Sequence, residues 1–154
     1  MIKKLLLLLF ISSAALADFS AKVINVIDGD TIDVLTSHDQ RIRIRLYGID
    51  APERGQAYVN KSRQFLTTLI GGKTVQITHK GGDIYHRSLG TVYYINDNIN
   101  AKMVENGYAW AYRYRGNVAV PSMVALESAA KANRLGLWQD NNPTPPWDFR
   151  QNNR

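Results

Sequence analysis

Residues 41–47 read Arg-Ile-Arg-Ile-Arg-Leu-Tyr, a strict alternation of charged and apolar side chains. Successive side chains of a β-strand point to opposite faces, so the segment predicts a strand. Ile42, Ile44 and Leu46 are expected to face a core, while the three arginines line the other face. The chain is therefore expected to contain a sheet with one face packed on a core.

Turn signals divide the rest of the chain into further elements. Asp28-Gly29 is a strong hairpin signal, Pro52 interrupts the strand pattern, and Gly71-Gly72 ends a helical stripe. The expected strands are 21–27, 31–35, 41–47, 73–78 and 89–95, and the expected helices begin after Gly55, near Asn100 and at Pro121. Five short strands with a helix between the third and fourth predict an α+β fold, a five-stranded OB-type barrel with about three packed helices.

The first 17 residues have the pattern of a cleavable signal peptide. Lys3 and Lys4 precede an apolar run that ends in Ala15-Leu16-Ala17. The run is shorter than the roughly 20 residues that span a bilayer, which argues against a membrane anchor. We expect an exported, periplasmic or secreted monomer without stable membrane association after cleavage. The expected organisation is a signal peptide (1–17), one OB-fold domain (18–139) and a Pro/Asn-rich tail (140–154) without assigned function, which Trp147 and Phe149 could hold to the body.

The chain has no cysteine, and its charge is unevenly distributed. The lack of cysteine excludes disulfides, zinc-thiolate sites and cysteine nucleophiles, and the three histidines lack close metal-ligand spacing. Residues 18–53 carry four Lys/Arg against seven Asp/Glu, a balance of −3, whereas residues 54–154 carry thirteen against six, a balance of +7. An acidic cluster would repel nucleic acid unless a cation sat there, and a bound metal would remove that conflict.

Four carboxylates lie in two loops that adjacent strands could bring together. Asp28 and Asp30 flank the first hairpin turn, and Asp50 and Glu53 follow the third strand. Oxygen ligands without His or Cys favour Ca²⁺ or Mg²⁺, and a loop cluster suits the looser coordination of Ca²⁺. Asp-Gly-Asp by itself is more often only a turn.

Arginines and aromatic residues supply candidate contacts for a phosphate and a base. Arg45 lies five residues before Asp50, and Arg87 follows Asp83 in a Gly-rich loop. A guanidinium offers a planar fork for two phosphate oxygens, although a solvated strand face explains Arg41, Arg43 and Arg45 equally well. Aromatic rings that could stack on bases, or belong to the core, are Tyr108, Trp110, Tyr112 and Tyr114.

Three motifs occur in order along the chain: Val26-Ile27-Asp28-Gly29-Asp30-Thr31, the segment from Arg43 to Glu53, and Asp83-Ile84-Tyr85-His86-Arg87. Together they resemble the micrococcal nuclease (thermonuclease) family of OB-fold, Ca²⁺-dependent nucleases. Weaker matches at 103–109 and 136–138 extend the resemblance over roughly Ala21 to Trp138. Two departures bear on substrate choice. Ile84 stands where the family's secreted enzyme has a basic residue, and the stretch 54–61 is shorter than that enzyme's loop.

The resemblance implies a role for each matched position. Asp30 and Asp50 would hold Ca²⁺ through their side chains, and Ala51 through its backbone carbonyl. Glu53 would take a proton from the attacking water or orient it. The remaining implied roles are phosphate binding by Arg45 and Arg87, assistance to the leaving oxygen by Arg87, and nucleotide contact by Tyr85 and Tyr112.

The expected function is that of an exported, Ca²⁺-dependent, sugar-nonspecific nuclease that cleaves DNA and RNA and leaves 3′-phosphate ends. The alternative is a non-catalytic OB-fold module that only binds nucleic acid. Because such modules tend to lose the catalytic carboxylates or arginines, retention of all five charged positions favours the enzyme. A structural envelope protein would explain export but not this charge pattern.

Overall fold

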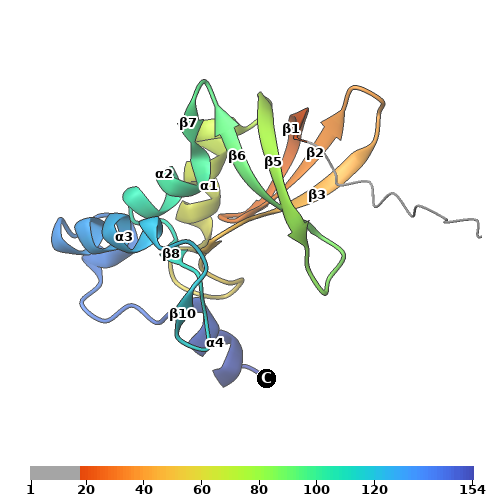
Figure 1. The fold of residues 1–154 in the computed structure, drawn as a ribbon. Helices are drawn as coiled ribbons and strands as arrows, with labels where there is room; N and C mark the ends of the chain where they lie inside the picture. Colours follow the sequence, from red (N-terminus) through yellow and green to blue (C-terminus); the bar gives the residue numbers. More distant parts are fainter. Residues whose placement is uncertain (1–17) are drawn as a thin grey trace, which may run out of the picture.

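The computed structural model describes residues 18–154 and shows a closed β-barrel with helices packed around one end (Figure 1). The expected signal peptide lies outside the described residues. The sheet order is β3-β2-β1-β5-β6, and a parallel pairing between β3 and β6 closes the ring. The barrel strands are β1 (Phe19–Asp28), β2 (Thr31–Thr36), β3 (Arg41–Leu46), β5 (Thr74–Gly82) and β6 (Ser88–Tyr94). The predicted α+β fold, a five-stranded OB barrel, is confirmed.

Strand β3 follows its alternating sequence with one departure. Ile44 and Leu46 are fully buried and Ile42 is partly buried against the core, as the pattern predicts. Arg41 and Arg43 are exposed on the other face, but the side chain of Arg45 is only 12% exposed. Alternation places Arg45 on the outer face, whereas the loops that cover this end of the strand bury it.

Three helices occur where the sequence predicts them. Helix α1 (Val59–Ile70) buries Leu66 and Ile70, and the N–H of Gly71 closes its last turn on the Thr67 carbonyl at 2.8 Å. Helix α2 (Ile99–Glu105) is capped by the Asn98 side chain, and α3 (Ser122–Ala132) packs on α2. Five two-residue strands complete the sheet pairings: β4 (Ile49–Asp50), β7 (Asp97–Asn98), β8 (Trp110–Ala111), β9 (Arg113–Tyr114) and β10 (Asn117–Val118).

The segment 140–154 contains a fourth helix that the sequence pattern did not predict. A 3₁₀ turn, η1 (Gly136–Gln139), precedes it, and helix α4 (Pro146–Asn152) begins with a proline in its first turn. The Trp147 ring packs edge-on against Trp110 with centroids 5.5 Å apart. A seven-residue helix has too few residues for an apolar period and depends on such tertiary contacts. None of the helices within 18–154 is both long and apolar enough to cross a membrane.

Two of the four aromatic residues considered as base-stacking candidates pack in the apolar clusters. Tyr108 stacks on Phe65 at 4.5 Å, and Trp110 lies in a second apolar cluster with Leu137 and Trp138. Tyr114, by contrast, is 60% exposed. Tyr108 and Trp110 therefore stabilise the packing of the helices and are not available to bind bases.

A surface ion-pair network joins β2 to β3. The Asp33 side chain is 1% exposed and accepts hydrogen bonds from Arg43 Nε at 2.7 Å and from Arg41 at 2.5 Å. Hydrogen bonds from Arg43 hold the pKa of Asp33 at about 2, against the opposing effect of burial and with help from Arg41. A lowered carboxyl pKa stabilises the folded state above the unfolded pKa of 3.8, and this stabilisation is lost as the pH falls toward 2.

Asp33→Asn is expected to lower the free energy of unfolding by about 1–2 kcal/mol at pH 7, because the half-exposed arginines screen part of the interaction. The deficit relative to the parent should shrink as the pH approaches 2. Urea unfolding at pH 7 and at low pH measures it, with Asp39→Asn at an exposed left-handed position as control. An equal deficit at both pH values would contradict the linkage.

Candidate active site

The β1–β2 turn presents Asp30 to the interior of the site. Asp28 Oδ1 accepts the N–H of Asp30 at 3.0 Å, which shapes the turn, and Asp30 Oδ1 accepts the Thr31 hydroxyl at 3.0 Å. Asp30 Oδ2 accepts the N–H of Ala51 at 2.7 Å, so the turn is joined to the loop that follows β4. Asp30 is only 5% exposed.

Asp50 and Glu53 come from β4 and the loop after it. Asp50 is fully buried in β4, where it pairs with Trp110 of β8. Pro52 ends this strand, and Glu53 follows with its side chain 37% exposed. The N–H of Glu53 donates to Gln56 Oε1 at 2.9 Å. The two carboxylates therefore differ in exposure: Asp50 is shielded from solvent, whereas Glu53 is accessible to water.

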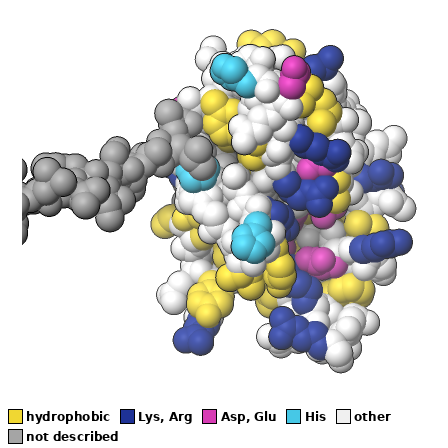
Figure 2. All heavy atoms as spheres, turned by 90° about the vertical axis from the view of Figure 1, so that its right-hand side faces the viewer, with side chains coloured by type: hydrophobic (Ala, Val, Ile, Leu, Met, Phe, Trp, Pro, Cys, Tyr) yellow, Lys and Arg dark blue, Asp and Glu magenta, His cyan; other side chains and the backbone are white. Residues whose placement is uncertain are grey.

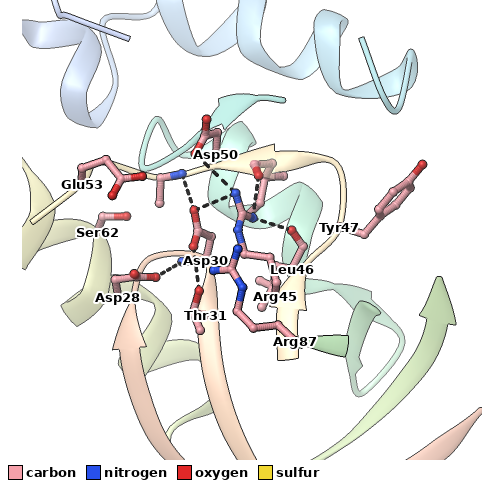
Figure 3. Close-up of polar contacts among 12 residues, drawn as sticks. Asp28, Asp30, Thr31, Arg45, Leu46, Tyr47, Asp50, Glu53, Ser62 and Arg87 are labelled. Atoms are coloured by element: carbon pink, nitrogen blue, oxygen red, sulfur yellow. Dashed lines mark hydrogen bonds and ion pairs between the residues drawn. The ribbon is translucent and has the colours of Figure 1, made fainter. Parts of the chain in front are cut away.

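Arg45 links both buried aspartates to the backbone (Figure 3). Its Nη1 donates to the carbonyls of Leu46 and Ile49, each at 2.8 Å. Its Nη2 lies 3.3 Å from a carboxylate oxygen of Asp30 and 3.3 Å from one of Asp50. One guanidinium thus holds two carboxylates that come from different loops.

Arg87 reaches the same place from the β5–β6 hairpin. Asp83 organises this hairpin by accepting the N–H groups of Tyr85 and Arg87 and the Arg87 Nε at 2.7 Å. Burial raises the pKa of Asp83, but these hydrogen bonds outweigh it and the pKa lies below its usual value. The β3–β6 register places Ile44 opposite Ser88, which directly follows Arg87. Figure 3 shows the Arg87 side chain pointing toward Asp30 and Arg45.

The two tyrosines predicted to contact nucleotide lie nearby. Tyr85 is 68% exposed at the hairpin tip, and its ring centroid is 5.3 Å from the Arg87 guanidinium. Tyr112 follows β8, partly buried, with its N–H bonded to the Gly48 carbonyl at 2.9 Å. Within residues 18–154, no hydrogen bond or ion pair joins either tyrosine side chain to the carboxylates. On the face seen in Figure 2, Lys and Arg side chains are gathered beside Asp and Glu side chains.

The donor set suits a hard cation. In the described part of the chain no three His, Cys, Asp or Glu side chains form a metal-binding group. The two aspartates predicted as ligands come together at Arg45, and the N–H of Ala51, the third predicted ligand, is bonded to Asp30. Burial, followed by the charge of Asp30, raises the pKa of Asp28 to about 7. Burial also raises the pKa of Asp50, although Arg150 and Arg45 oppose it. A donor set made only of oxygen atoms fits Ca²⁺ or Mg²⁺.

The sequence did not identify Arg150, which lies on α4. Its Nη2 lies 2.8 Å from Asp50 Oδ2, and its Nη1 lies 2.5 Å from Glu53 Oε1 and 3.1 Å from Asp50 Oδ1. The sequence signal was limited to Trp147 and Phe149 as possible anchors. Arg150 directly follows the second of these anchors, but its partners lie 97 and 100 residues away in the chain.

A closed OB barrel with this array of carboxylates and guanidinium groups defines the class of OB-fold phosphodiesterases. The family model for staphylococcal nuclease homologues matches residues 43–140. A micrococcal nuclease of Shigella flexneri is 47% identical, with 93% of this chain and 87% of that protein aligned. The protein ParB of Escherichia coli is 42% identical (97% and 90% aligned), and an uncharacterized endonuclease of Haemophilus influenzae is 40% identical (95% and 82% aligned). The chain belongs to the staphylococcal nuclease family and is a hydrolytic nuclease.

Gly29 has no room for a side chain. A Cβ at this position would overlap Ser62 Oγ and come within 2.9 Å of Ala51 Cβ. We expect Gly29→Ala to lower the free energy of unfolding by about 1–3 kcal/mol through overpacking. Urea unfolding measures it against Gly82→Ala, where the added Cβ makes an ordinary 3.6 Å contact with the Arg87 carbonyl. Equal stabilities of the two variants would show that the turn can move away from α1.

Proposed function

We propose that the protein is a Ca²⁺-dependent, sugar-nonspecific nuclease that hydrolyses phosphodiester bonds of DNA and RNA and leaves 3′-phosphate ends. The observation that carries the proposal is the arrangement of Arg45 and Arg87 beside the Asp30, Asp50 and Glu53 carboxylates. Hydrolysis of a phosphodiester needs positive charge at the phosphate and a base that activates water. Guanidinium groups can supply the first, and a carboxylate can supply the second.

Each group has a chemical task in this mechanism. Glu53, the exposed carboxylate, accepts a proton from the water that attacks phosphorus. Arg45 and Arg87 bind the non-bridging oxygens as negative charge builds on them. The bond from phosphorus to the 5′ oxygen breaks, Arg87 assists that oxygen, and the phosphate stays on the 3′ side.

The Asp30 and Asp50 side chains and the Ala51 carbonyl would hold Ca²⁺, which supplies positive charge to the phosphate when bound. The relatives support nucleic acid as substrate, since they are described as a micrococcal nuclease and as endonucleases. Support for Ala51 as a ligand is that its N–H donates to Asp30 Oδ2 at 2.7 Å, which keeps its backbone beside that aspartate. The oxygen-only donor set is the support for an alkaline-earth cation over zinc.

Substrate recognition in the proposal rests on phosphates and base stacking. Tyr85 offers an exposed ring beside Arg87, and Tyr112 lies near the β3–β4 turn. Such contacts read no base edge and no 2′-hydroxyl, so cleavage would tolerate sequence and sugar and weaken with salt. The proposal further includes export to the periplasm or the medium, for which the support is the signal-peptide pattern of residues 1–17, and a monomeric state.

Cleavage of single-stranded DNA, duplex DNA and RNA by purified residues 18–154 is expected with Ca²⁺ and not with chelator. Glu53→Gln should keep nucleic-acid binding and lose turnover by on the order of a hundredfold or more, because the amide cannot accept the proton. Cleavage rates and binding titrations with Ca²⁺, Mg²⁺ and chelator measure both. Binding without cleavage under every metal would instead support the non-catalytic OB-fold module.

Arg45→Ala and Arg87→Ala are each expected to lower turnover by on the order of a hundredfold or more, because each removes preorganised positive charge from the phosphate. Arg63→Ala on the exposed face of α1 is the matched control and should cleave like the parent. Single-turnover rates at saturating Ca²⁺ measure the effect. Parent-like rates for Arg87→Ala would remove that arginine from the mechanism.

A further inference from the structure

Helix α4 brings a third guanidinium group to the active-site carboxylates. Arg150 Nη1 lies between Glu53 Oε1 and Asp50 Oδ1, while its Nη2 binds Asp50 Oδ2 at 2.8 Å. We propose that Arg150 is a positioning residue of the active site, which fixes the Glu53 carboxylate by holding it against the buried Asp50. The inference rests on the proposed function for its catalytic consequence, whereas the positioning itself can be tested without it.

Glu53 needs an external partner to be held in one orientation. It follows Pro52 in a loop, its side chain is 37% exposed, and within residues 18–154 its carboxylate forms a hydrogen bond with Arg150 alone. A free glutamate side chain samples several rotamers, and ordering it costs on the order of 1–2 kcal/mol. The contact at Oε1 leaves Oε2 to accept a proton from water.

Asp50 fixes the orientation of the Arg150 guanidinium group. The aspartate is fully buried in β4, so its two oxygens are fixed points, and both accept hydrogen bonds from the guanidinium. A planar fork on two fixed oxygens sets the plane of the guanidinium, and the same Nη1 then reaches Glu53. A lysine ammonium has no such fork and could not hold both carboxylates with the same precision.

The tail that carries Arg150 is attached to the body by contacts independent of the carboxylates. Trp147 packs on Trp110 at 5.5 Å, and the Arg113 guanidinium lies 5.8 Å from the Trp147 ring. Gln56 Nε2 donates to the Thr144 carbonyl at 2.5 Å. These contacts hold the tail, and with it α4, against the rest of the domain beside the site.

Gln56 adds a second connection between the tail and Glu53. Its Oε1 accepts the Glu53 N–H at 2.9 Å while its Nε2 holds Thr144. The tail therefore determines the position of Glu53 twice, at the backbone through Gln56 and at the carboxylate through Arg150. A tail whose contacts converge on one glutamate fits a positioning role.

The opposite role would be inhibition. Arg150 neutralises Asp50 and Glu53, so a latch would have to leave before a cation or substrate entered. The independent anchors of α4 argue against this, since each would have to break. The two roles predict opposite results when Arg150 is replaced: loss of order and turnover for positioning, tighter Ca²⁺ binding and faster turnover for inhibition.

Carbon-13 NMR of glutamate carboxylates tests the positioning directly. The chain has only three glutamates, Glu53, Glu105 and Glu127. Glu127 is buried and bound to Arg113 and Lys131, so it is the rigid reference, while the exposed Glu105 is the mobile one. Glu53→Gln identifies the third signal. We expect Glu53 to relax like Glu127 in the metal-free parent and like Glu105 in Arg150→Gln.

Kinetics and calorimetry then test the consequence. Arg150→Gln is expected to lower kcat by about 10- to 100-fold with KM within about threefold. It should cost little more in a Glu53→Gln background, because a residue that acts through Glu53 has nothing left to position. Arg150→Lys should rescue only part of kcat, and the exposed Arg154→Gln is the matched control. Calorimetry gives the Ca²⁺ affinity of the metal-free Arg150→Gln variant, and only the inhibitory role couples tighter Ca²⁺ binding to a raised kcat.

Each contrary result overturns the proposal in its own way. A Glu53 signal that is mobile in the parent, or unchanged by Arg150→Gln, would mean that Arg150 does not order it. Equal losses of kcat in both backgrounds would mean that the arginine acts only on stability or binding. Tighter Ca²⁺ binding with a raised kcat would make α4 an inhibitory latch. A parent that cleaves nothing would refute the proposed nuclease mechanism, while the NMR result would still decide the positioning.

Discussion

The arrangement of the site depends on two buried carboxylates, Asp30 and Asp50. Burying a negative charge is costly unless positive groups or hydrogen bonds compensate it. Arg45 compensates both from within the barrel, and Arg150 compensates Asp50 from outside it. The backbone of Ala51 adds a hydrogen bond to Asp30. Pairing of this kind holds two loops, one strand end and one helix around a single point.

The barrel supplies the geometry that makes this pairing possible. The antiparallel order β3-β2-β1-β5-β6 is closed by the parallel β3–β6 ladder, which aligns Arg45 with Leu89. Arg87 immediately precedes β6, so barrel closure brings it beside a strand far from it in sequence. Asp83 then aims its side chain through the hydrogen bond to Nε. The spacing of the two arginines is thus set by the strand register together with the Asp83–Arg87 contact.

The sequence predicts much of this arrangement because local signals agree with it. Alternation at 41–47, the Asp28-Gly29 turn and the glycine helix stops have near-neighbour causes, and they locate the barrel strands and three helices. Motif order identifies Asp30, Arg45, Asp50, Glu53 and Arg87 as candidates. Arg150 escapes such reasoning because α4 has no apolar period and its partners are distant in the chain. The burial of Arg45 is likewise a tertiary effect that alternation cannot show.

The charged groups of the site are widely dispersed along the chain, from Asp30 through Arg87 to Arg150. Bringing such distant groups together requires closure of long loops, which occurs only as the barrel itself forms. A partly folded chain therefore has the same arginines and carboxylates but no place where they meet. Nuclease activity in such a molecule therefore requires the completed fold. An unfolded chain would not cleave the nucleic acid of the cell that makes it.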